Sequence, residues 1–120
     1  SALKKVCLLT NCEIKDYTVA PIFMEGRKKG AHEWMIEFKN EPKDFDNFKF
    51  QLDLALQEVN SDYEAKRYNN MTLNAPLVHQ ARPDLFYDWL KMHNKVGGQH
   101  KVPRLSNSRT YLEELLKLSN

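Results

Sequence analysis

Charged and apolar residues alternate over a central segment of the chain, and this alternation predicts a β-strand. Two sets interleave there: His32, Trp34, Ile36 and Phe38 with Glu33, Met35, Glu37 and Lys39. A period of two places the first set on one face of the strand and the second set on the other. We therefore expect one face to pack in the core and the charged face to meet water or a partner.

A second strand is expected just upstream, over about residues 13–24, because this segment is rich in aromatic and β-branched residues. Pro21 lies within it and cannot donate a ladder hydrogen bond, which predicts an edge strand or a bulge there. Gly26 and Gly30 bracket a basic loop between the two strands. The two strands together favour an antiparallel hairpin.

Helical spacing dominates the next part of the chain. Residues 2–10 carry a short apolar pattern that we interpret as the tail of a helix. The clearest helix follows Asp44, a plausible N-cap. Its apolar positions recur at helical spacing: Phe45, Phe48, Leu52, Ala55, Leu56 and Val59. Ser61 and Glu64 have the spacing of a capping box, which predicts a second, short helix ending at Arg67.

The remaining segments complete an α+β pattern. A third strand is expected over residues 73–81, and Pro83 suits the first turn of a helix whose apolar stripe covers residues 85–93. Residues 106–108 can cap a last helix. Grouped strands and helices favour an α+β fold over a doubly wound one. We predict a single domain over residues 1–120, a small sandwich in which a mostly antiparallel sheet of three to four strands packs with about four helices.

Composition limits the class of protein. The 120 residues are 42% apolar and 28% charged, which is ordinary for a soluble globular domain. A net charge of +2 is too small to favour nucleic acid or anionic membranes, and no apolar run is long enough to span a bilayer. Cys7 and Cys12 are the only cysteines, and five residues apart they would not share a helix face. We interpret both as reduced thiols of a cytosolic protein.

The most unusual segment is Gly97-Gly98-Gln99-His100-Lys101-Val102-Pro103-Arg104. Adjacent glycines leave the backbone free to move or to approach a ligand, and Lys101 and Arg104 supply positive charge. A mobile cationic loop suits a phosphate or a developing oxyanion. The alternative is an ordinary surface loop between two helices. It is no Walker-type loop, because the Lys-Ser/Thr ending is absent.

Two further groups of residues are candidates for chemistry. Tyr63 and Arg67 belong to a run that either presents them to a partner domain or simply forms a capped helix with solvated charges. The four histidines show no metal-ligand spacing with each other or with the cysteines. The sequence therefore predicts no metal site.

In these segments the chain resembles the auxin-responsive promoter family of acyl acid–amido synthetases. Residues 97–104 resemble the family's Gly-Gln-x-Lys-x-Pro-Arg signature, and residues 73–78 its Ile-Gly-Pro-Leu-x-(Ile/Val) strand. Tyr63 and Arg67 match its Tyr-x-x-x-Arg helix, and residues 34–38 are similar to a strand of the same domain. The matches run in family order, and the bacterial branch looks closer than the plant enzymes.

The resemblance implies the C-terminal lid of an adenylate-forming enzyme, inactive alone. The intact parent would bind ATP, Mg, an acyl acid and an amine, whereas no cofactor is expected in this fragment. The partner would be the parent's own N-terminal nucleotide-binding domain. By position in the motif, the catalytic lysine is Lys101. Loop positioning or phosphate binding would fall to four residues: Gly97, Gly98, Gln99 and Arg104.

Two other functions stay open at this point. The chain could be a stand-alone α+β interaction module that binds a protein through the basic loop at Arg27, Lys28 and Lys29. It could instead be an RNA-binding domain whose sheet aromatics, such as Trp34, stack on bases. The near-neutral charge counts against the RNA hypothesis.

Overall fold

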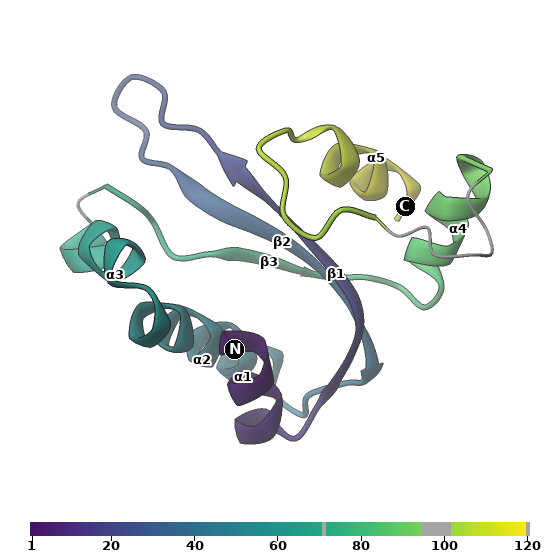
Figure 1. Ribbon diagram of the computed structural model, residues 1–120, viewed down its shortest axis with the longest axis horizontal. Helices are drawn as coiled ribbons and strands as arrows, with labels where there is room; N and C mark the ends of the chain where they lie inside the picture. The colour runs from purple at the N-terminus through teal and green to yellow at the C-terminus, as the bar shows by residue number, and fades with distance from the viewer. Residues whose placement is uncertain (71, 95–101, 120) are drawn as a thin grey trace.

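A three-stranded sheet lies between two layers of helices in the computed structural model, which describes residues 1–70, 72–94 and 102–119 (Figure 1). The strand order is β1 (Glu13–Ile22), β2 (Ala31–Asn40), β3 (Leu77–Gln80). The helices are α1 (Ala2–Thr10), α2 (Phe45–Val59), α3 (Ser61–Arg67), the 3-10 helix η1 (Tyr68–Asn70), α4 (Leu85–Met92) and α5 (Thr110–Leu118). The predicted α+β class and order of elements are confirmed, with five α-helices in the described ranges where about four were expected.

The sheet is mixed in direction. β1 and β2 form the predicted antiparallel hairpin, with Pro21 on an edge strand as expected. β3 lies parallel to β2, because two helices carry the chain back across the sheet between them. β3 is shorter than predicted. Leu73 makes only an isolated bridge to Gly30, and Pro76, which has no N–H to donate, lies just before the ladder begins.

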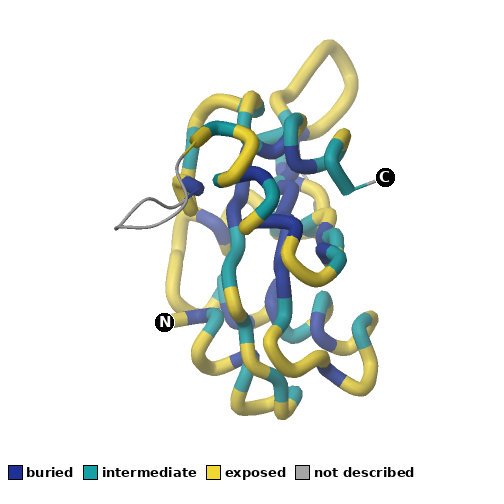
Figure 2. Tube along the Cα trace, turned by 90° about the vertical axis from the view of Figure 1, so that its right-hand side faces the viewer, coloured by how far each residue is buried: buried dark blue, intermediate teal, exposed yellow. Residues whose placement is uncertain are grey.

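Helices cover both faces of the sheet. One cluster of buried residues, with Val6 and Phe48 among them, lies between the sheet and helices α1 and α2. A second, with Met35, Trp89 and Leu115 among them, lies on the side of α4 and α5. Figure 2 shows buried positions along the strands and exposed ones in the outer loops. The core is therefore divided in two by the sheet.

The prediction that the charged face of β2 meets water or a partner is wrong. Glu33, Met35 and Glu37 are only 6%, 1% and 2% exposed. The alternation does mark a strand, but α4 and α5 cover its second face. Hydrogen-bond donors of the protein replace water around both carboxylates and offset the free-energy cost of burying them.

The helix caps are partly as predicted. Asp44 is confirmed as the N-cap of α2, since its Oδ1 accepts a hydrogen bond from the Asn47 N–H at 3.1 Å. The cap of α3 is Asn60 rather than Ser61, and its Oδ1 accepts from the Tyr63 N–H at 3.1 Å. Asn60 has an extended backbone (φ −142°), so a single residue ends α2 and starts α3.

Replacing Leu52 by alanine tests the core beneath α2. Leu52 is fully buried, so the Leu52→Ala variant should lose about 2–5 kcal/mol of unfolding free energy through lost burial and a cavity. Leu54, two residues along the same helix, is 39% exposed, and Leu54→Ala should cost less than about 1 kcal/mol. Urea denaturation followed by circular dichroism measures both. Equal losses would contradict the described packing of α2.

Candidate functional site

The end of the glycine-rich segment is fixed to the outer edge of β1. Val102 is buried in the core at 1% exposure, and Thr18 Oγ1 donates to the Pro103 carbonyl at 2.5 Å. The Val19 N–H donates to the Arg104 carbonyl at 2.8 Å. Residues 102–106 thus extend the sheet by a short parallel pairing. Gly97, Gly98, Gln99 and Lys101, the other predicted residues of this segment, lie outside the described residues.

Arg104 lies at the rim of a groove between α1 and β1. Its guanidinium carbon is 5.0 Å from the centre of the Tyr17 ring, a cation–π contact, and its Nε is 4.0 Å from Asp16 Oδ1. The groove measures about 440 Å³, and Lys4 and Lys15 also line it. The Arg104 side chain is half exposed, so an anionic group could reach its guanidinium.

The two cysteines also line this groove, and their side chains are in contact. Asn11 takes a left-handed conformation (φ 53°) after α1, and the Cys12 N–H then donates to the Cys7 carbonyl at 3.1 Å. A turn of this kind folds the chain back on the last helical turn. Burial first, and then the hydrogen bond with Cys12, raise the pKa of Cys7 from 9.0 to about 11. Helical spacing alone missed this pair, because the contact arises from the turn.

Tyr63 and Arg67 converge on one buried carboxylate. Tyr63 Oη donates to Asp53 Oδ1 at 2.7 Å, and Arg67 donates to both Asp53 oxygens at 2.8 and 2.6 Å. Arg67 Nη1 also donates to the Leu73 carbonyl at 3.1 Å. The two motif residues therefore bind α3 to α2 and to the segment before β3. The expectation of solvated charges is wrong for Arg67, whose side chain is only 11% exposed, whereas the capped helix is present.

The electrostatics of Asp53 fit this structural role. Burial raises the pKa of Asp53, but the hydrogen bonds from Arg67 and Tyr63 outweigh it, and the pKa falls below its ordinary value. Burial, followed by the bond to Asp53, raises the pKa of the Tyr63 hydroxyl. The carboxylate is thus charged and the phenol neutral at neutral pH. Asp53 lacked any sequence signal, because it lies in the preceding helix and belongs to none of the matched motifs.

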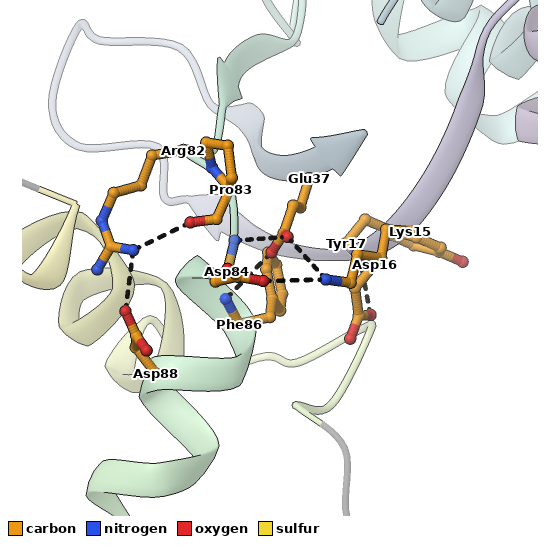
Figure 3. Close-up of polar contacts among 9 residues, drawn as sticks. All are labelled: Lys15, Asp16, Tyr17, Glu37, Arg82, Pro83, Asp84, Phe86 and Asp88. Atoms are coloured by element: carbon orange, nitrogen blue, oxygen red, sulfur yellow. Dashed lines mark hydrogen bonds and ion pairs between the residues drawn. The ribbon is translucent and has the colours of Figure 1, made fainter. Parts of the chain in front are cut away.

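Glu37 of β2 holds the start of α4 (Figure 3). Its carboxylate accepts hydrogen bonds from the Asp84 N–H at 2.9 Å and the Phe86 N–H at 3.2 Å, and Lys15 Nζ lies 3.4 Å away. Asp84 precedes α4 with φ 67°, and its own side chain makes no cap bond. Glu37 therefore takes the place of a local N-cap. Its negative charge also interacts favourably with the positive end of the α4 dipole.

Glu33, the other buried carboxylate of β2, holds the approach to α5. Arg109 Nη2 donates to Glu33 Oε1 at 2.8 Å, and His79 Nε2 lies 2.6 Å from Glu33 Oε2. Burial raises the pKa of Glu33, but the bonds to His79 and Arg109 together lower it below its usual range. Arg109 Nη1 also donates to the Pro21 carbonyl at 2.9 Å. These contacts tie β1, β2, β3 and the start of α5 together.

Within residues 1–70, 72–94 and 102–119, no three His, Cys, Asp or Glu side chains are grouped to hold a metal ion. No helix in the same ranges has the length and apolar character needed to cross a bilayer.

Comparisons with known proteins identify the fold. Residues 1–110 match the profile of the GH3 family C-terminal domain. The solved structure described as "AtGH3.15 acyl acid amido synthetase in complex with 2,4-DB" is similar, with a TM-score of 0.74 at 17% identity, over 99% of this chain and 23% of that one. A second, "GH3.15 acyl acid amido synthetase", has a TM-score of 0.72 at 18% identity, over 98% and 22%. A search of curated proteins finds no match.

These likenesses show a shared fold at low sequence identity. The chain spans less than a quarter of the length of either solved structure, since it covers 23% and 22% of them. Both proteins therefore contain large regions that have no counterpart in these 120 residues.

Removing Arg67 should destabilise the chain strongly. In Arg67→Met, the buried Asp53 carboxylate loses its cation, which typically costs about 3–5 kcal/mol of unfolding free energy. Lys66→Ala is the control, because its pair with Asp62 is exposed and worth less than about 0.5 kcal/mol. Urea denaturation at neutral pH compares the two variants, and a loss below 1 kcal/mol for Arg67→Met, on the order of a surface pair, would contradict the structural role.

The same variant has a predicted dependence on pH. The wild-type pKa of Asp53 is depressed, so its stabilising effect is complete above the ordinary value of 3.8 and is lost as the pH falls through the folded-state value. Without Arg67, the Asp53 carboxylate stays buried and keeps the hydrogen bond of Tyr63, but it loses its cation, so its pKa should be higher in the variant than in the wild type. The stability gap between wild type and Arg67→Met should therefore narrow as the pH falls below 5, roughly one unit above the ordinary pKa.

Cys7 should react slowly while the chain is folded. With its pKa near 11 instead of 9.0, the reactive thiolate at pH 8 is about 100-fold rarer than in the unfolded chain. Iodoacetamide labelling, with the two cysteines resolved by fragment-ion mass spectrometry, should show this ratio between buffer and urea. The folded rate should rise as the pH approaches 11. Equal rates in buffer and urea would contradict the described contact between the two half-buried thiols.

Proposed function

Because the chain belongs to the GH3 family, whose C-terminal domain it matches over residues 1–110, we propose that it is the lid of an ATP-dependent acyl acid–amido synthetase. The family match is the observation that carries this proposal. The fold shared with two acyl acid amido synthetases supports it. Alone, the chain would be inactive, and its partner would be the parent's own N-terminal nucleotide-binding domain.

The proposed reaction has two steps. A carboxylate oxygen of the acyl acid attacks the α-phosphorus of ATP, which gives an acyl-adenylate and releases pyrophosphate. An amine, such as that of an amino acid, then attacks the acyl carbon and releases AMP. ATP and magnesium would be bound by the N-terminal domain. The lid would rotate over that domain between the steps and exclude water from the reactive adenylate.

Lys101 is the residue that we propose to act in the first step. Its ammonium would stabilise the negative charge that develops between the carboxylate and the α-phosphate. One such contact in a closed site is worth about 3–4 kcal/mol. Gly97, Gly98 and Gln99 would let the loop take up its position over the nucleotide.

Arg104 would serve the same step from a fixed place. Its backbone is bonded to β1 and its guanidinium lies half exposed over Tyr17, so it can meet a phosphate without reorganising. The buried Val102 ties the chain just after Lys101 to the body of the domain. A rotation of the domain would therefore carry the Arg104 guanidinium with it. The free thiols of Cys7 and Cys12 are compatible with a cytoplasmic enzyme.

The full-length parent tests the proposal. An immunoblot of the source cells against this domain should detect a product several times larger than 14.1 kDa. That protein should catalyse ATP–pyrophosphate exchange that depends on an acyl acid, and Lys101→Ala should lower the exchange rate about 100- to 1,000-fold. Lys91→Ala, an exposed lysine on α4, is the matched control and should exchange at the normal rate.

One result would remove the proposal, and another would remove only one part of it. A native product of about 14 kDa would mean that the domain exists without a nucleotide-binding partner in the same chain. Normal exchange by the Lys101→Ala parent would instead remove only the role given to the lysine. If the native product is about 14 kDa, the stand-alone interaction module becomes the hypothesis to test. The test replaces the exposed Arg27, Lys28 and Lys29 and measures the capture of a protein partner.

A further inference from the structure

The two cysteines meet where α1 ends and the chain turns into β1. Asn11 takes a left-handed conformation (φ 53°, ψ 49°), and the Cys12 N–H donates across it to the Cys7 carbonyl at 3.1 Å. A backbone bond of this span over a left-handed residue is that of a Schellman turn, and the side chains of the two joined residues commonly touch. The turn at the end of α1 therefore brings the two thiols together.

The backbone also satisfies the distance that a disulfide requires. The Cα atoms of Cys7 and Cys12 are separated by one hydrogen bond and a few short covalent bonds, so they lie within about 7 Å of each other. Cysteines whose Cα atoms are farther apart than about 7 Å cannot be bridged. Thr10 Oγ1 lies 3.3 Å from Cys12 Sγ and keeps that side chain beside the last turn of α1. The two sulfurs can thus be joined with little movement of the backbone.

A small molecule can reach the thiols from solvent. Cys7 and Cys12 are both half-buried, and both line the groove of about 440 Å³ between α1 and β1. A groove of this volume is within the range of small-molecule sites in proteins. The pair therefore differs from cysteines enclosed in a core, which are chemically inert.

The charges along the groove favour an anionic reagent. Lys4, Lys15 and Arg104 line it together with one carboxylate, Glu13, among the residues that the structure describes. Glu13 is itself paired with Lys39 at 3.5 Å. Lys15 and Arg104 also approach carboxylates that do not line the groove. The excess of positive charge attracts anions, and salt screens that attraction.

We propose that Cys7 and Cys12 are a site of reversible oxidation, at which a small anionic disulfide converts the two thiols into one intramolecular disulfide. Disulfides of cytosolic proteins are usually of this transient kind. The site goes beyond the proposed adenylation, and neither its chemistry nor its test depends on that reaction.

The oxidation takes two exchange steps. Cys7 keeps its proton at neutral pH, because burial and the hydrogen bond with Cys12 raise its pKa, so the Cys12 thiolate attacks first. It bonds to one sulfur of the small disulfide and releases the other half as a thiolate. The Cys7 thiolate then attacks Cys12 Sγ and releases the second half. The chain gives up two electrons and two protons, and the small disulfide becomes two thiols.

The second step is helped by the first. Once Cys12 is part of the mixed disulfide, its hydrogen bond and its charge no longer raise the pKa of Cys7. Burial then remains as the main cause of the raised pKa, and the Cys7 thiolate becomes more abundant. A thiol that reacts slowly with external reagents is thus suited to the intramolecular step.

Oxidised glutathione, which is anionic at neutral pH, is the probe for the reduced chain. After a quench with N-ethylmaleimide, the wild-type chain should have lost about 2 Da, carry no maleimide, and regain both thiols in excess reduced glutathione. Cys7→Ser should stop at the mixed disulfide on Cys12. Cys12→Ser should form its adduct about tenfold more slowly than Cys7→Ser, because the remaining thiol is the one whose pKa burial raises.

Three final products of the wild-type chain would overturn the proposal. They are a glutathione adduct that never closes, a disulfide-linked dimer and an unreacted dithiol. Intact mass spectrometry separates them, and fragment ions assign the bond to Cys7 and Cys12.

A cationic disulfide, cystamine, tests the role of the groove charges. The rate ratio of oxidised glutathione to cystamine should be about three- to tenfold higher for the folded chain than for the chain in urea, at low ionic strength. This excess should vanish near 1 M salt, where the Debye length is about 3 Å. Lys4→Gln should reduce it, and Lys91→Gln, at an exposed position on α4, should leave it unchanged. Equal ratios in the folded and unfolded chains would overturn the preference for an anionic disulfide.

Discussion

Two carboxylates in the central strand organise the layer of helices that covers them. Glu37 accepts hydrogen bonds from the first turn of α4, and Glu33 binds the arginine that precedes α5. Charged groups at 2% and 6% exposure are stable only when donors replace their lost water. The positions of α4 and α5 are therefore set by polar contacts as well as by the apolar cluster beneath them. Whatever moves either helix leaves a buried charge without its partners.

The layer of α1 and α2, on the opposite face of the sheet, also contains a buried carboxylate that binds a peripheral helix. The contacts of α1 and α2 with the sheet are apolar, and the only buried charge described there is Asp53 of α2. This carboxylate holds Tyr63 and Arg67 of α3, and through Arg67 the segment that leads to β3. The short helix α3 is thus docked by hydrogen bonds more than by burial. In each layer a buried anion determines where a peripheral element attaches.

Local patterns predicted the elements well, because strand alternation and helical spacing depend on near neighbours in sequence. The N-cap at Asp44, the end of α3 at Arg67 and the edge strand with Pro21 all follow from such patterns. The second face of β2 could not be predicted. Glutamates at alternate positions have the same pattern whether water or a helix terminus faces them, and α4 lies more than forty residues further along the chain.

The candidate site was predictable only in part for the same reason. Arg104, Tyr63 and Arg67 were singled out by local sequence features and by resemblance, but their partners Tyr17 and Asp53 lie in other elements and carry no local signal. The Cys7–Cys12 contact depends on a left-handed Asn11, which helical spacing does not consider. The groove at Arg104 is the least predictable feature, because α1, β1 and Arg104 combine to line it and are distant in sequence.

The pairing of residues 102–106 with β1 has a consequence for how copies of this domain behave toward each other. The outer edge of a sheet presents unpaired backbone groups, and these are a common starting point for aggregation. Here Val19 is bonded through both its N–H and its carbonyl, to Arg104 and to Ser106. The segment that carries Arg104 therefore also covers the outer edge of the sheet. A chain that ends before Val102 would lose Arg104. It would also expose the outer edge of β1, where other copies of the chain could pair and aggregate.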